Sequence, residues 1–156
     1  MGTVLGLVFG IAYNLVMIVS YTCSFLTPFQ SEVLEGLSMV VIPTAQGKLG
    51  LLSRHAPMTL KIKSGVVAIY KNDKLWRHYF IWGGLARVGR ELCEIFTETF
   101  TLLDELDPLV LGEELERYHN DLAGLTIEDE RRALSYKIAI TEAMVQALKE
   151  HHNRAH

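Results

Sequence analysis

The sequence predicts a β + α chain in which a β-sandwich is followed by an antiparallel hairpin of two helices. Through the first two thirds of the chain, short apolar runs alternate with Gly, Pro, Asn and Asp, as expected for strands joined by tight turns. Beyond Asp104 the apolar residues recur every three or four positions, which is the period of an amphipathic helix. We therefore divide the chain into an apolar N-terminal extension (1–16), a sandwich domain (17–103) and a helical hairpin domain (104–156).

Composition and charge exclude several classes of function. The 15 Lys and Arg residues are outnumbered by 18 Asp and Glu residues and form no basic block, so nucleic acid is excluded as a partner. Cys23 and Cys93 lie in apolar runs without the spacing of a zinc site, and we expect buried thiols and no bound metal. No Ser or Cys lies in a nucleophile motif, so we expect no catalytic residue and no resident cofactor.

The first 30 residues carry no charged side chain, and two interpretations of this stretch stay open. Gly2, Gly6 and Gly10 have the spacing at which small residues let membrane helices pack, so residues 3–20 form a marginal membrane span in one interpretation. In the other interpretation Met17 is the native start, and everything before it is an upstream extension that is not native.

Strands are predicted wherever apolar and polar side chains alternate between turn residues. Residues 19–27 alternate in this way, and Pro28 ends the strand because it has no N–H to donate. Residues 71–74 are polar, and the Asn and Asp at their centre tolerate the left-handed backbone of a hairpin tip. The remaining predicted strands are 33–34, 37–42 (ending before Pro43), 60–62, 67–70, 75–82, 85–88 and 92–100. Eight to ten short strands with regular turns fit a sandwich or a flattened barrel.

Two helices are predicted in the C-terminal domain. Asp107 and Pro108 are a typical N-cap and first helical residue, and Gly124 ends the first helix. Thr126 and Asp129 have the spacing of a capping box that opens the second helix. The second helix presents an apolar interaction stripe, formed by Leu134, Ile138, Val145 and Leu148. Because a hairpin has little core of its own, this stripe must bury against the sandwich or against a partner protein.

Several motifs, taken in order, resemble a known family. They are F-L-T-P at 25–28, I-P-T-x-x-G-K-L-G-L-L at 42–52, R-H-A-P at 54–57, S-G-V-V at 64–67, G-G at 83–84 and D-E-L-D at 104–107. Over residues 20–150 the chain resembles the epsilon subunit of the F-type proton-transporting ATP synthase, which is equivalent to the mitochondrial delta subunit. The resemblance implies a ten-stranded sandwich and two helices at the foot of the rotating central stalk.

The function implied by the resemblance is that of a non-catalytic rotor subunit, which couples proton flow through a membrane ring to ATP synthesis. Its implied partners are the gamma subunit, the membrane proteolipid ring and the alpha/beta head, and the hairpin can restrain ATP hydrolysis. The lack of an Arg-rich transit peptide favours the cytoplasmic side of a bacterial inner (plasma) membrane, with peripheral attachment through the complex. The alternative, a membrane-anchored β-sandwich adaptor unrelated to ATP synthesis, requires the first 20 residues to be inserted in a membrane.

A loop that contacts the ring is also implied by the resemblance. It corresponds to Gln46, Gly47, Lys48 and Leu49, with His55 of the H-A-P motif nearby. Many members of the family carry an acidic residue at the position of Lys48, so the charge of this loop is inverted here.

A nucleotide site is the last feature that the resemblance implies. In some members a motif on the second helix binds ATP, and it is matched here at Asp129, Arg132 and Ala133. Glu128 replaces the aliphatic residue that begins this motif, and a carboxylate beside a polyphosphate is repulsive. We therefore expect no cofactor other than ATP as a regulatory ligand.

Overall fold

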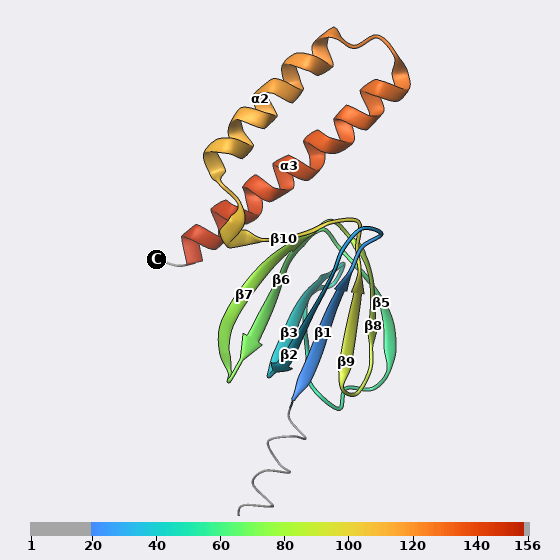
Figure 1. Ribbon diagram of the computed structural model, residues 1–156, viewed down its shortest axis with the longest axis vertical. Helices are drawn as coiled ribbons and strands as arrows, with labels where there is room; N and C mark the ends of the chain where they lie inside the picture. The colour runs from blue at the N-terminus through green and yellow to red at the C-terminus, as the bar shows by residue number, and fades with distance from the viewer. Residues whose placement is uncertain (1–19, 155–156) are drawn as a thin grey trace, which may run out of the picture.

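The computed structural model describes residues 20–154, which form a two-sheet sandwich with a pair of helices at one end (Figure 1). The strands are β1 (Tyr21–Leu26), β2 (Ser31–Leu37), β3 (Met39–Thr44), β4 (Gly47–Leu51), β5 (Met58–Ile62), β6 (Gly65–Lys71), β7 (Lys74–Ile81), β8 (Gly84–Val88), β9 (Leu92–Phe96) and β10 (Phe100–Leu102). One turn of 3-10 helix, η1 (Leu103–Glu105), leads into α2 (Pro108–Gly124) and α3 (Glu128–Arg154). The predicted fold class is confirmed. The predictions made for residues 1–16 and for Met17 lie outside the described residues.

The two sheets have five strands each, in the orders β2-β1-β9-β8-β5 and β10-β7-β6-β3-β4. Side chains that alternate along the strands meet between the sheets in one apolar core, whose buried members all lie between Tyr21 and Phe100. Phe25 joins the two layers, since its ring centroid lies 4.7 Å from that of Tyr79 and 5.2 Å from that of Phe100. The sandwich therefore has a core that contains no residue of the hairpin.

Two tight turns follow from the residues that form them. Asn72 and Asp73 have φ angles of 53° and 60°, and the pairing of Lys71 with Lys74 makes them a two-residue hairpin turn, which confirms the predicted tip. Gly84 has a φ of 127°, and a Cβ atom there would lie 1.9 Å from the Phe96 carbonyl oxygen. Only glycine fits at this close approach of β8 to β9.

Several of the predicted strand limits are wrong, and β4 was not predicted. The break predicted at Gly36 lies at Ser38, because β2 runs through Leu37 and β3 begins at Met39. β3 continues through Pro43. Its pairing with β6 ends at Val41, so at Pro43 the only paired strand is β4, and no second strand requires a hydrogen bond from the N–H that proline lacks. The Pro43 carbonyl still accepts a bond from Lys63 N (2.9 Å). Residues 92–100 form two strands rather than one. β9 belongs to the first sheet and β10 to the second, so residues 97–99 carry the chain from one layer to the other.

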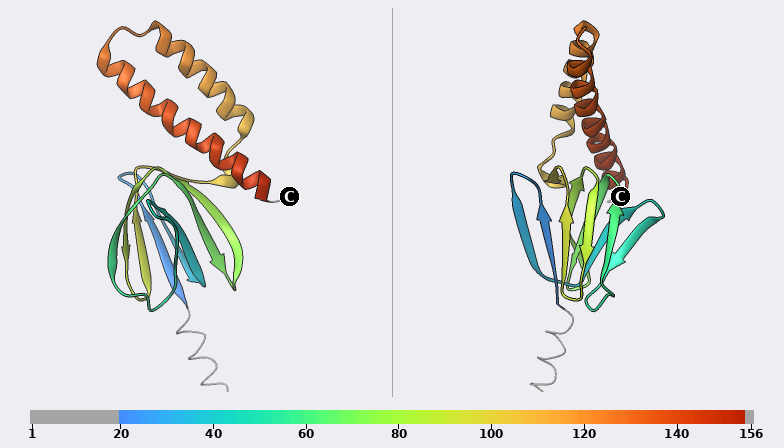
Figure 2. Two further views of the ribbon diagram at one scale, coloured as in Figure 1. Left: turned by 180° about the vertical axis from the view of Figure 1, so that it is seen from behind. Right: turned by 90° about the vertical axis from the view of Figure 1, so that its right-hand side faces the viewer.

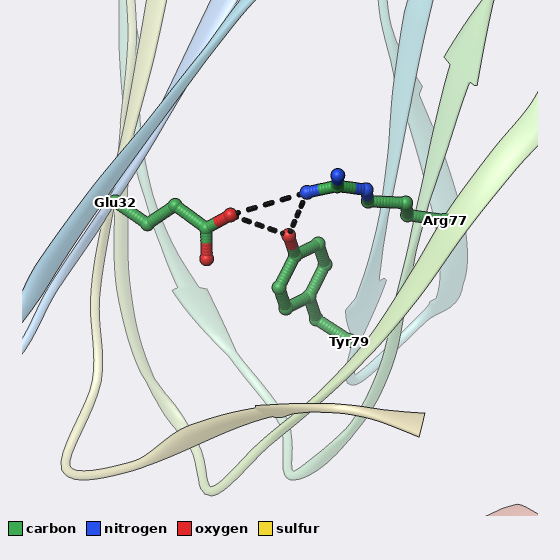
Figure 3. A network of polar contacts seen from close by, with 3 residues as sticks. All are labelled: Glu32, Arg77 and Tyr79. Atoms are coloured by element: carbon green, nitrogen blue, oxygen red, sulfur yellow. Dashed lines mark hydrogen bonds and ion pairs between the residues drawn. The ribbon is translucent and has the colours of Figure 1, made fainter. Parts of the chain in front are cut away.

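A polar network ties the two sheets together at one side of the sandwich (Figure 3). Glu32 of β2 accepts a hydrogen bond from the Tyr79 hydroxyl (2.8 Å) and one from Arg77 Nη1 (3.3 Å), and both partners belong to β7 of the other sheet. Arg77 Nη1 also donates to the Tyr79 hydroxyl (3.1 Å). Burial raises the pKa of Tyr79 to about 12, with Glu32 acting in the same direction and Arg77 opposing it.

The helical hairpin projects from the end of the sandwich that is opposite the start of β1, and its two helices run antiparallel (Figures 1 and 2). Asp107 is the N-cap of α2, because its carboxylate accepts a bond from Leu109 N (2.9 Å), as predicted. The predicted capping box at Thr126 and Asp129 is wrong. α3 begins at Glu128, and the carbonyl of Ile127 accepts its first helical bond, from Arg131 N (3.0 Å).

Candidate functional site

The predicted ring-contact loop is a tight turn between β3 and β4. Gln46, Gly47 and Lys48 are exposed there, and Leu49 is half-buried at the edge of the core. Gly47 has a φ of 116°, and its carbonyl accepts a bond from the Thr44 hydroxyl (2.6 Å) across the turn. The turn therefore holds a short polar tip, with one cation, in a fixed conformation.

His55 does not lie beside this tip, so the structure separates the predicted set into two places. The bond from Lys63 N to Pro43 O (2.9 Å) puts the tip beside the connection from β5 to β6. The bond from Arg54 N to Arg90 O (2.7 Å) puts the His55 loop beside the connection from β8 to β9, at the other end of β5. His55 is half-buried, and its Nδ1 lies 3.3 Å from the Ala56 carbonyl oxygen.

The predicted nucleotide motif lies on the exposed first turns of α3. Asp129, Arg132 and Ala133 are all exposed, and Arg132 Nη2 lies 4.0 Å from Oε1 of Glu128, one turn earlier. Ala133 lines an open hollow of about 660 Å³ between the helices, whose charged side chains are Asp121, Glu130 and Lys137. The carboxylates outnumber the amine in this hollow, which disfavours a polyphosphate.

Arg131, which the motif does not include, joins the two helices. Its Nη1 donates to the carbonyl oxygens of Leu122 (2.9 Å) and Leu125 (2.8 Å) at the end of α2. The Leu122 carbonyl also accepts a bond from Leu125 N (3.3 Å), and both carbonyls lie at the C-terminal end of α2, where a cation is favourably placed. Further down the hairpin, His119 of α2 faces Glu142 of α3 at 3.6 Å. Neither contact was predicted from the sequence, because both depend on how the two helices pair.

The side chains of the α3 interaction stripe face two different parts of the same chain. Leu134 faces α2, since it lines the hollow between the helices, whereas Leu148 is 4% exposed and packs on the sandwich with Val145. Ile138 is buried as well. The cluster under Leu148, called here the docking cluster, consists of Phe80, Leu103, Leu111, Ala147 and Leu148. It is separate from the sandwich core, and it is where the hairpin docks on the sandwich.

Two polar contacts flank the docking cluster, and the sequence did not predict either. Trp82 Nε1 donates to the Tyr136 hydroxyl (2.6 Å), which in turn donates to Glu98. At the other side the rings of His78 and His151 meet edge to face, with centroids 4.3 Å apart. Burial lowers the pKa of His78, and His151, Arg154 and Lys48 lower it further, while Asp104 acts in the opposite direction.

The described residues contain neither a membrane span nor a metal cluster. Within residues 20–154, no helix is both long and apolar enough to cross a bilayer. The same part of the chain holds no group of three or more His, Cys, Asp or Glu side chains that could bind a metal ion.

Comparison with known proteins identifies the family. A sequence profile described as "ATP synthase, Delta/Epsilon chain, beta-sandwich domain" matches residues 20–102, which are the ten strands of the sandwich. The chain belongs to the ATP synthase delta/epsilon chain family. This membership confirms the resemblance seen in the sequence, and it selects the rotor interpretation over an adaptor unrelated to ATP synthesis.

Individual members of the delta/epsilon family agree with this assignment. The chain is 30% identical to the ATP synthase epsilon chain of Rhodospirillum centenum (strain ATCC 51521 / SW), covering 78% of this chain and 87% of that one. It is also 30% identical to the epsilon chain of Rhizobium meliloti (strain 1021), covering 79% and 92%. Its fold matches a chain in the Euglena gracilis mitochondrial ATP synthase structure with a TM-score of 0.58, at 19% identity, covering 88% of this chain and 82% of that one. The chain is thus an epsilon-type subunit of an ATP synthase, a complex associated with a membrane.

Proposed function

We propose that this chain is a non-catalytic rotor subunit, which transmits rotation between the membrane ring and the catalytic head through a rigid sandwich. The observation that carries the proposal is the division of the chain into two separately packed parts. The sandwich core lies wholly between Tyr21 and Phe100, and the hairpin is attached through the docking cluster. A body with its own core can bear torque while the attached hairpin changes position.

The gamma subunit and the proteolipid ring are the partners proposed for the sandwich. The solved structure from Tetrahymena thermophila with a related fold (TM-score 0.51, 13% identity, covering 82% of this chain and 96% of that one) is described as the central stalk and c-ring of a mitochondrial ATP synthase. The tip at Gln46–Leu49 offers an exposed polar turn with the cation of Lys48, which suits contact with polar loops of the ring. His55 is left out of this contact, because it lies at the other end of β5.

The site of action that we propose is the cytoplasmic face of a bacterial plasma membrane, with attachment through the complex alone. The bacterial relatives at 30% identity support this choice. The test is an affinity pull-down of the full chain from detergent-solubilised native membranes. Recovery of gamma, of the alpha/beta head and of the proteolipid is expected. Recovery of the chain without any of them would overturn the proposal.

The hairpin is proposed to restrain ATP hydrolysis when it leaves the sandwich and reaches the catalytic head. Support comes from apolar side chains that stay exposed on the docked hairpin, such as Leu109 (71% exposed) and Ile127 (58%), and that a partner surface can cover. Hydrolysis by the reconstituted enzyme is compared between the full chain and a chain that ends at residue 103. We expect faster hydrolysis with the shortened chain. Equal rates, with equal incorporation of both chains, would remove the inhibitory role and leave the rotor role intact.

ATP is retained as a proposed regulatory ligand at Asp129, Arg132 and Ala133. The side chains of Asp129 and Arg132 are exposed and free to reorient around a phosphate, although Glu128 lies beside Arg132. Titration of the full chain with ATP, and of its Arg132→Met variant, tests this directly. Equal affinity of the two chains would exclude the motif as the binding site.

A further inference from the structure

Two free thiols face each other in the core of the sandwich. Cys23 of β1 and Cys93 of β9 are partners in the register of these two parallel strands, which lie side by side in the first sheet (Figure 1). Both side chains are 0% exposed and belong to the sandwich core, as the sequence predicted for them. A hydrogen bond between the two thiols, together with burial, raises the pKa of Cys23 well above its usual value. The two sulfur atoms are therefore neighbours.

The spacing of the two cysteines suits a disulfide bond. Neighbouring strands of a sheet lie about 4.7–4.9 Å apart, which is within the range of about 4.4–6.8 Å that separates the Cα atoms of bonded cysteines. Both side chains also point to the same side of the sheet, since both lie in the core. A disulfide carries no charge and no S–H group, so an apolar core accepts it without the cost of burying a thiolate.

The two cysteines lie close to the end of the sandwich at which β1 begins. Cys23 is the third residue of β1, and Cys93 is the second residue of β9. The pairing of β1 with β2 is irregular between Tyr21 and Cys23. The Tyr21 hydroxyl donates to the Gly89 carbonyl (3.1 Å), in the connection from β8 to β9, and so closes this end. Because the end of a ladder opens more easily than the whole domain unfolds, release of Tyr21 gives access to both thiols.

We propose that Cys23 and Cys93 form a reversible disulfide with a small-molecule disulfide as the oxidant, after this end of the sandwich opens locally. One cysteine thiolate attacks a sulfur atom of the oxidant, whose S–S bond breaks and releases one thiolate. The second cysteine then attacks the protein sulfur of the mixed disulfide and displaces the other half of the oxidant. The two cysteines are oxidised, the oxidant is reduced to two small thiols, and the protons of the cysteines pass to these thiols.

Opening of this end controls the reaction. Only the thiolate attacks a disulfide, and in the closed sandwich the raised pKa of Cys23 disfavours its thiolate. The closed core also leaves no room for the mixed disulfide, because both cysteines are 0% exposed. The rate of oxidation therefore reports how often Tyr21 is released.

The bond strengthens the sandwich without fixing the hairpin. It joins β1 to β9, so it closes a loop that contains most of the sandwich and reduces the freedom of the unfolded chain. The docking cluster contains neither cysteine, so the hairpin can still dock and be released in the oxidised chain. The inference does not rest on the proposed rotor function, because it concerns the sandwich of the isolated chain.

The test is intact-mass analysis of the reduced full chain after incubation with hydroxyethyl disulfide in native buffer. A mass lower by two hydrogen atoms is expected, and peptide mapping is expected to link Cys23 to Cys93. The midpoint of urea unfolding rises in the oxidised chain, and dithiothreitol returns it to the value of the reduced chain. Cys93→Ala shows neither change, because its remaining thiol has no partner in the same chain.

Two further variants test the opening step. Tyr21→Phe removes the bond to Gly89 and is expected to form the disulfide about fivefold faster. Ile81→Val is the matched control. It removes one methylene group from the same core at the hairpin end of β7, and it lowers the free energy of unfolding by a similar amount while Tyr21 stays in place. Its rate of disulfide formation is expected to equal that of the unaltered chain.

Several results would overturn the proposal. They are thiols that stay free in both the unaltered chain and Tyr21→Phe, a bond that joins two chains instead of Cys23 to Cys93, and an oxidised chain with a lower urea midpoint. The last result would mean that the bond does not fit the folded sandwich. Equal acceleration by Tyr21→Phe and Ile81→Val would overturn the local opening, because the thiols would then react only after the whole sandwich unfolds.

Discussion

Leu148→Ala is expected to release the hairpin from the sandwich while the sandwich stays folded. Leu148 is 4% exposed in the docking cluster, and Phe80 beneath it is fully buried. Truncation of a buried leucine to alanine costs about 2–5 kcal/mol, and α3 can settle partly into the gap, so the lower end of this range applies. A loss of about 2 kcal/mol raises the ratio of undocked to docked chains about 30-fold.

Native-state hydrogen exchange measures this release. Amides in the C-terminal half of α3 are expected to exchange about 30-fold faster in Leu148→Ala, because the undocked hairpin has lost its support on the sandwich. Amides of β1 and β9 keep their protection, since the core around them contains no hairpin residue. Leu109→Ala is the control, because Leu109 is 71% exposed on α2. Unchanged exchange in α3, or equal acceleration in β1 and β9, would refute a separately docked hairpin.

Three further predictions concern single polar groups. Burial lowers the pKa of His78, so the docked state binds protons less readily than the released state, and docking weakens as the pH falls below about 6.5. Exchange of α3 amides, compared at pH 5.5 and 7.5, should show this effect of pH on docking. We expect His78→Gln to remove the effect and His55→Gln, the control, to keep it. Arg131→Met removes the donor to two carbonyls and destabilises the last turn of α2 by about 1 kcal/mol, measured as faster amide exchange there, whereas Arg132→Met leaves this turn unchanged. Because the pKa of Tyr79 is raised in the folded state, the unfolded chain ionises first, and the free energy of unfolding falls as the pH rises from 10 towards 12. The free energy of unfolding in urea, measured at pH 9 and at pH 11, should therefore differ less in Tyr79→Phe than in the unaltered chain. An equal difference in both chains would contradict this role of Tyr79.

Most of the strands and both helices were predictable from the sequence because each is specified locally. β4 was missed, since its five residues include Gly47 and Gly50, and glycine is depleted in strands. Alternation marks the strands, and the cap at Asp107 marks the start of α2. The break between β9 and β10 was missed, since Thr97 and Thr99 continue the alternation while the chain crosses to the other sheet. A change of layer leaves no periodic signal, because the side-chain period is the same in both sheets.

The site was less predictable, because its contacts join residues that are distant in the sequence. His78 and His151 are on β7 and α3, and neither has a neighbour in the sequence that points to the other. Tyr136 lies two residues before Ile138, on the other side of the helix, so the interaction stripe did not include it. His55 was misplaced for the opposite reason. It is near the tip in sequence, but β4 carries the chain along the sandwich between them.

The separation of the two apolar clusters determines the free energy that is needed to release the hairpin from the sandwich. If the hairpin contributed to the sandwich core, its release would unfold the whole chain, and no partner could shift that equilibrium without destroying the rotor. Here the release exposes the docking cluster alone, in which each large apolar side chain is worth about 1.5–3 kcal/mol. A partner surface or a change in pH acts on a difference of this size. The docking cluster is thus large enough to keep the hairpin docked, and small enough that its release does not require the sandwich to unfold.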